Sequence, residues 1–148
     1  MTNRPHIDAL NGFLADSFTL YLKTKNFHWH ITGPHFRDYH LLLDEQASQI
    51  LAMTDIIAER VRKQGAATLT SIGAISRHQT LKDHDSTDLD ASAMLDLLRA
   101  DNLALVIATK ALKVLVDEAS DNATSGLVDQ WTDEAEQRAW FLESAKGH

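Results

Sequence analysis

The sequence predicts an all-α fold, in which four long helices form one bundle and a single domain covers residues 1–148. Apolar residues make up 44% of the chain and recur every three or four positions, as they do on the buried face of a helix. Only two prolines and six glycines are present, and runs of β-branched residues are few. A chain of 148 residues is long enough to bury one hydrophobic core.

The first helix is expected from Pro5 to Ile31, because proline suits the first turn of a helix. Its apolar stripe directs His28 towards the bundle, whereas His30, about 200° further round the helix, is expected to face solvent. The stripe comprises Ile7, Leu10, Leu14, Tyr21 and His28.

The second helix is expected from Pro34 to Lys63, after a break in which Gly33 caps the first helix. Its core stripe comprises Phe36, Leu43, Ala47, Ile50, Thr54, Ile57 and Val61. Other faces carry Leu41, Leu42, Leu51, Met53 and Ile56. A helix that is apolar on more than one side must be covered on more than one side, so the pattern predicts a partner subunit packed on this helix.

The second half of the chain begins with a long connection, residues 65–90, in which a short helix is expected near Ser71 to His78. His78 and His84 in this connection are expected to be solvated. The third helix is expected from an N-cap at Asp90 to about Ser120, and the fourth from about Thr124 to Ala145. Their inward stripes comprise Met94, Leu98, Leu105, Ala108, Leu112, Leu115 and Ala119, and Leu127, Val128, Trp131, Ala135, Leu142 and Ala145.

The three connections between the long helices are short, long and short in that order. Short connections make consecutive helices antiparallel neighbours, and a single long crossover is the connectivity of ferritin-like bundles. The predicted fold is therefore a ferritin-like four-helix bundle with a short extra helix in the long connection between the second and third helices.

Four potential metal ligands, His40, Asp44, Asp55 and Glu59, lie at helical spacing on the second helix. The first two are four residues apart, as are the last two, so each pair lies on one face. All four fall within an arc of about 100°, but the two pairs are centred about 22 Å apart along the axis. Metal–ligand bonds are only about 2 Å long, so one helix cannot bring both pairs to one metal.

A second copy of this helix, antiparallel and related by a two-fold axis near Gln49 and Ile50, would complete each site. His40 would then face Glu59 of the partner subunit, and Asp44 would face Asp55 of the partner subunit. The spacing therefore predicts a symmetric dimer with two identical sites shared between subunits. The alternative for such polar residues is a solvated helix face, but the strongly apolar positions around them favour a shared site.

The ligand types suit iron, manganese or zinc, because imidazole and carboxylate are present and cysteine is absent. A dinuclear carboxylate site inside a four-helix bundle usually needs Glu-x-x-His motifs, which this sequence lacks. The site is therefore expected at a subunit boundary, where metals with few protein ligands keep positions open for an oxidant.

These residues resemble the signature of the Dps proteins, the mini-ferritins of bacteria. The matching positions are His28-Trp29, Gly33, Phe36, His40, Asp44, Asp55 and Ala58-Glu59-Arg60. The resemblance extends over essentially the whole chain, including the helix lengths, the short helix in the long connection and Trp140-Phe141 near the end.

The resemblance implies a hollow homododecamer built from two-fold dimers, in which ferrous iron is oxidised, preferably by hydrogen peroxide, and stored as ferric oxyhydroxide. It implies a dinuclear iron centre between subunits, and no haem is expected. By similarity, one subunit supplies His28, His40 and Asp44, and its two-fold partner supplies Asp55 and Glu59, with Glu59 as the main bridging carboxylate. Trp29 is expected either to take up stray oxidising equivalents or to pack as an aromatic residue in the bundle.

The net charge of −7 disfavours contact with nucleic acid. DNA-binding Dps members usually carry a flexible tail rich in lysine and arginine. Here Arg4 is the only cation before the first helix, and Lys146 is the only one in the last five residues. Twelve such subunits would carry about −84. A DNA-compacting nucleoid protein is therefore the second hypothesis, and a purely structural helical assembly without a redox role is the third.

A cytoplasmic location is expected, with association with the nucleoid if the protein binds DNA, because the first residues contain no apolar signal region. No membrane span is expected, since the most apolar run, 103–116, is short and contains two lysines. The family's acidic three-fold pore lies around the turn between the third and fourth helices. Here that turn contains Asn122, Ala123 and Gly126 where aspartates are common, and the candidates to replace them are Asp117, Asp121 and Asp129.

Overall fold

The computed structural model describes residues 2–147 and contains five helices and no strands within that range. The helices are α1 (Pro5–His30), α2 (Phe36–Lys63), α3 (Ile72–His78), α4 (Ala91–Glu118) and α5 (Asn122–Lys146). The predicted all-α class is confirmed, and every predicted helix is present.

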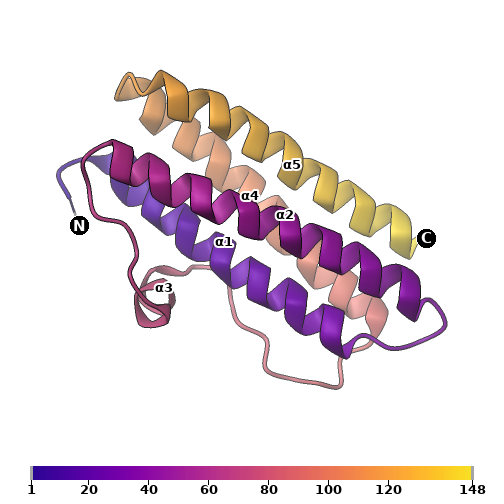
Figure 1. Ribbon diagram of the computed structural model, residues 1–148. Helices are drawn as coiled ribbons and strands as arrows, with labels where there is room; N and C mark the ends of the chain where they lie inside the picture. Colours follow the sequence, from indigo (N-terminus) through magenta and orange to yellow (C-terminus); the bar gives the residue numbers. More distant parts are fainter. Residues whose placement is uncertain (1, 148) are drawn as a thin grey trace.

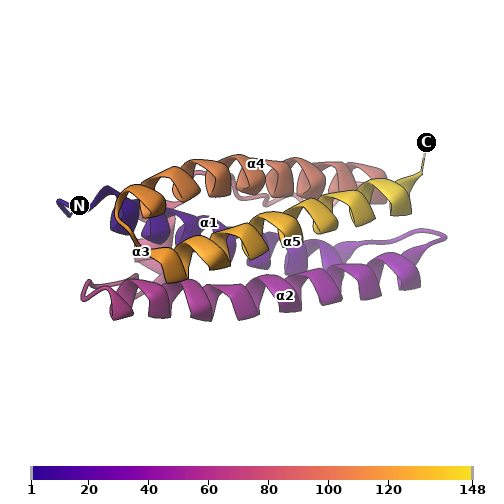
Figure 2. The same ribbon diagram turned by 90° about the horizontal axis from the view of Figure 1, so that it is seen from above.

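The four long helices lie side by side as two antiparallel hairpins, α1 with α2 and α4 with α5 (Figures 1 and 2). The segment between α2 and α4 runs the length of the bundle and carries α3, which packs against α1 (Figure 1). This single long crossover confirms the predicted ferritin-like connectivity.

The helix ends agree with the predicted ones to within a few residues, with one difference that has a physical cause. The second helix begins at Phe36, two residues later than expected, because residues 33–35 form a turn in which the Phe36 amide donates to the Gly33 carbonyl at 3.1 Å. Gly33 has a φ of +120°, which a residue with a Cβ rarely adopts. Asp90 caps α4 as predicted, because its carboxylate accepts from the Ala93 amide at 2.8 Å.

The hydrophobic core is built from one stripe of each long helix and is centred on large side chains such as Trp131, which stacks on Phe13 at a centroid distance of 5.6 Å. Burying one such side chain contributes about 1.5–3 kcal/mol. Most of the predicted stripe residues are buried. Ala119 and Ala145 are exposed, contrary to prediction, because they lie at helix ends beyond the packed region. Phe36 is also largely exposed, since it begins α2 and its ring stacks on His40 instead of entering the core.

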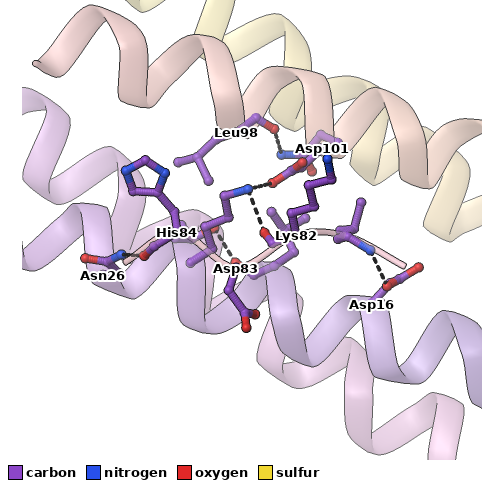
Figure 3. A network of polar contacts seen from close by, with 12 residues as sticks. Asp16, Asn26, Lys82, Asp83, His84, Leu98 and Asp101 are labelled. Carbon is purple, nitrogen blue, oxygen red and sulfur yellow. Dashed lines mark hydrogen bonds and ion pairs between the residues drawn. The ribbon is translucent and has the colours of Figure 1, made fainter. Parts of the chain in front are cut away.

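The long connection is held against the bundle by polar side chains of α1 and α4 (Figure 3). Asp16 accepts from the backbone amides of Thr80 at 2.6 Å and Leu81 at 2.9 Å. Lys23 donates to the Lys82 carbonyl at 2.9 Å and pairs with Asp101, also at 2.9 Å. Because these groups are largely buried, the connection follows a defined path rather than a solvated loop.

The path of this connection corrects one sequence expectation. His84 is not solvated as expected but half-buried. Asn26 donates to its backbone carbonyl at 3.0 Å (Figure 3). The His84 ring packs edge-on against Phe27, with the ring centroids 5.5 Å apart. His78 and His30 are exposed, as expected.

Candidate metal centre

Two histidines meet where α1 ends and α2 begins. His28 lies in the last turn of α1 and is 8% exposed, and His40 lies in the second turn of α2. Their rings stack with centroids 3.8 Å apart and an interplanar angle of 11°. The short link of residues 31–35 makes this meeting possible, because it returns the chain directly alongside α1.

Each of these imidazoles is hydrogen-bonded to the backbone of the other residue. Nδ1 of His28 lies 2.6 Å from the His40 carbonyl oxygen, and Nδ1 of His40 lies 2.7 Å from the His28 carbonyl oxygen. A carbonyl oxygen can only accept, so both Nδ1 atoms carry hydrogen. In the neutral form of each ring, the lone pair is therefore on Nε2, which is the tautomer that a metal-binding histidine needs.

Asp44 lies one turn further along α2 and is the third predicted ligand in this part of the structure. Its Oδ1 atom is 3.9 Å from Nε2 of His28 and 2.8 Å from Nζ of Lys25. The hydrogen bond from Lys25 holds the pKa of Asp44 below its usual value, and the two histidines act in the same direction. Asp44 is therefore an ionised carboxylate at neutral pH, and 47% of its side chain is exposed.

Asp55 and Glu59, the other two predicted ligands, lie away from this group. Both are exposed on α2, and Asp55 follows Asp44 by about 16 Å along the helix axis. Among residues 2–147, no three or more His, Cys, Asp or Glu side chains are close enough together to hold a metal ion. Within one chain, the five predicted residues thus lie in two separate groups.

The interior of the bundle carries a fixed positive charge. Arg138 on α5 is 2% exposed, and its guanidinium donates to the side-chain oxygens of Asn102 and Gln49, both at 2.7 Å. Burial lowers the pKa of Arg138 to about 10, so it remains protonated at neutral pH. A buried cation held by neutral amides disfavours a metal ion at this level of the bundle. The sequence did not identify Arg138 as an interior residue, because arginine is usually exposed.

The outer face of α2, which bears Asp55 and Glu59, is apolar and uncovered within one chain. Leu41, Leu51 and Ile56 are 44%, 42% and 40% exposed. Trp29, next to His28, is 58% exposed and so is not packed inside the bundle of its own chain. Several large apolar side chains exposed along one face are typical of a protein–protein interface.

The aspartates proposed for the pore region all have partners within the chain. Asp121 is the N-cap of α5, where its carboxylate accepts from the Thr124 amide at 3.2 Å and pairs with Arg60 at 2.9 Å. Burial opposes ionisation of Asp121, but Thr124 and Arg60 outweigh it and hold its pKa below the usual value. Asp129 pairs with Lys113 at 2.9 Å, and Asp117 accepts from the Ser125 hydroxyl.

Comparison with known proteins shows a match to one protein family and to several relatives. Residues 7–146 match the Ferritin family model, which describes a ferritin-like domain. The chain is 35% identical over 142 residues to an uncharacterized low temperature-induced protein of Nostoc sp., covering 93% of this chain and 78% of that one. It is also 35% identical over 140 residues to the DNA protection during starvation protein of Agrobacterium fabrum, and the match covers 93% of this chain and 85% of that one.

A solved structure shows the same relationship in three dimensions. The Dps protein from Bacillus brevis matches with a TM-score of 0.93 and 27% identity, covering 99% of this chain and 100% of that one. The chain therefore belongs to the ferritin-like family and, within it, to the Dps proteins. This membership supports a general role in iron storage and protection. None of the helices within residues 2–147 is long and apolar enough to cross a membrane.

The ion pair between Arg60 and Asp121 allows a test of the packing of α2 on α5. Asp121→Asn keeps the N-cap acceptor but leaves the mostly buried Arg60 without an opposite charge, so we expect a loss of about 2 kcal/mol in unfolding free energy at pH 7. The pKa of Asp121 is lower in the folded protein than the value of 3.8 expected in the unfolded chain. The ionised carboxylate therefore stabilises the fold above pH 3.8, and this stabilisation is lost as the pH falls through the folded pKa.

Urea unfolding at pH 7 and at about pH 3 measures both effects, and the difference between wild type and variant should narrow at the lower pH. The matched control is Asp129→Asn, whose pair with Lys113 is largely exposed and should contribute less than about 0.5 kcal/mol. Equal losses in the two variants would contradict a special role for Asp121.

Proposed function

We propose that this protein is a ferroxidase and iron-storage mini-ferritin. It oxidises Fe(II), preferably with hydrogen peroxide, at dinuclear centres between subunits and stores ferric oxyhydroxide in a shell of twelve. The observation that carries the proposal is the reciprocal hydrogen bonding of His28 and His40, which leaves both Nε2 atoms available beside the ionised Asp44. A cytoplasmic location is part of the proposal.

A second chain is needed to complete each centre. One chain supplies two imidazoles and a carboxylate, and Asp55 and Glu59 on the same helix are too distant to join them. A two-fold axis near Gln49 brings Asp55 and Glu59 of the partner subunit to this group. The exposed apolar side chains on the outer face of α2 support this packing, because a partner helix there would remove them from water.

The ligand chemistry suits iron as the substrate. Neutral imidazole nitrogens and carboxylate oxygens are suitable ligands for Fe(II), and no thiolate is present. Two Fe(II) ions give one electron each to hydrogen peroxide, which takes up two protons and leaves as two water molecules. The three carboxylates contributed by the two chains would offset the positive charge that grows when Fe(II) becomes Fe(III).

Removing one ligand from each half-site tests this assignment. His28→Ala and Glu59→Ala are each expected to slow iron oxidation by about 10- to 100-fold. The measurement is the ferric absorbance after anaerobic Fe(II) loading and addition of peroxide. His30→Ala is the matched control, because His30 lies two residues from His28 on α1, is exposed, and its ring is hydrogen-bonded to Asn26. Wild-type rates in both ligand variants would refute the site.

Mixed assemblies test whether each centre is shared between two chains. Subunits carrying His28→Ala and subunits carrying Glu59→Ala, unfolded together and reassembled in equal amounts, should regain about a quarter of wild-type activity. Half of the random dimers contain one chain of each kind, and each of these has one intact centre out of two. If all ligands came from one chain, mixing would restore nothing.

DNA binding is the alternative function, and it is favoured by the names of relatives such as the DNA protection during starvation protein of Brevibacillus brevis, which is 30% identical over 135 residues. The charge of this chain opposes it, because a net −7 repels phosphate. A gel-shift experiment at low salt and neutral pH should therefore show no retardation of duplex DNA. A shift that weakens steeply with added salt would restore the alternative.

A further inference from the structure

The imidazole of His40 is covered by an aromatic ring on each of its two faces. The His28 ring stacks on one face, with the centroids 3.8 Å apart and the planes inclined by 11°. The Phe36 ring also stacks on His40, with the centroids 4.9 Å apart and the planes inclined by 25°. Two rings cannot stack on the same face of one imidazole, so Phe36 covers the face opposite to His28.

The start of α2 places the Phe36 ring in this position. Phe36 is the first residue of the helix and precedes His40 by four residues, so the two side chains lie on one face, one turn apart. The preceding turn fixes this start, because the Phe36 amide donates to the Gly33 carbonyl at 3.1 Å. The Phe36 side chain remains 43% exposed, so burial in the hydrophobic core does not explain its position.

We propose that Phe36 is a positioning residue of the metal centre, whose ring holds the His40 imidazole in the orientation in which Nε2 binds iron. This inference rests on the proposed function. Nδ1 of His40 donates to the His28 carbonyl at 2.7 Å, and this bond fixes the place of one ring atom. It does not fix the plane of the ring, because the χ2 torsion of histidine has broad minima and a single hydrogen bond tolerates some tilt.

A ring on each face removes this remaining freedom, because any swing of the His40 ring would drive its edge into one of its two neighbours. The His28 side is firm, since His28 is 8% exposed and its own Nδ1 donates to the His40 carbonyl at 2.6 Å. Phe36 supplies the wall on the solvent side. An aromatic pair contributes about as much as a hydrogen bond between neutral groups, and ligand atoms must keep their direction closely, so loss of this wall should be measurable.

Anaerobic titration with Co(II), followed by its visible absorbance, tests this role without measuring oxidation. Phe36→Leu keeps an apolar side chain but removes the flat ring, so Co(II) should bind about 2- to 10-fold more weakly and with an altered d–d spectrum. Phe36→Tyr keeps the ring and should restore the affinity and spectrum of the wild type. Phe141→Leu is the matched control and should leave both unchanged, because Phe141 is 38% exposed on α5 and packs on Trp140 instead of a histidine.

The possible outcomes separate this inference from the proposed function. Wild-type affinity and spectrum in Phe36→Leu, or equal losses in Phe36→Leu and Phe36→Tyr, overturn the role of the Phe36 ring, provided that His40→Ala still weakens Co(II) binding strongly. If His40→Ala binds Co(II) as the wild type does, the metal centre itself is wrong. Phe36→Met gives the same decision if Phe36→Leu impairs folding or assembly, and circular dichroism with gel filtration identifies that case.

Discussion

The reciprocal hydrogen bonds between His28 and His40 are the constraint on which the rest of the proposed site depends. The last carbonyl groups of a helix lack partners within it, and the His40 ring satisfies one of them at the end of α1. One pair of contacts therefore does three things. It closes the turn between α1 and α2, selects the tautomer of both rings, and holds two ring nitrogens next to Asp44.

The buried charges of this bundle are held by other side chains of the helices that pack around them. Arg138 lies at the contact of α5 with α2 and α4 and is held by amide side chains rather than by carboxylates. Lys23 pairs with Asp101 inside the α1–α4 contact, and this pair helps to fix the long connection. The buried polar groups thus serve packing, whereas Asp55 and Glu59 are exposed on the outer face of α2.

Much of the fold is encoded locally and could be predicted from the sequence. Apolar periodicity located all four long helices, and the lengths of the connections predicted the order in which they pack. The residues wrongly predicted to be buried, Ala119, Ala145 and Phe36, lie at helix ends. Periodicity does not show where neighbouring helices stop covering a face. His84 was misjudged for a related reason, since its burial depends on Asn26 and Phe27, which are distant in sequence.

By itself, the sequence determined which residues share one face of one helix, because the angle between positions follows from the helical repeat. That was enough to place His40 and Asp44 on one part of α2, with Asp55 and Glu59 on another. Only the tertiary structure decided how α1 is rotated against α2. That rotation stacks His28 on His40, directs Lys25 at Asp44 and encloses Arg138. Contacts between helices depend on how whole side-chain surfaces pack together, and no local repeat encodes them.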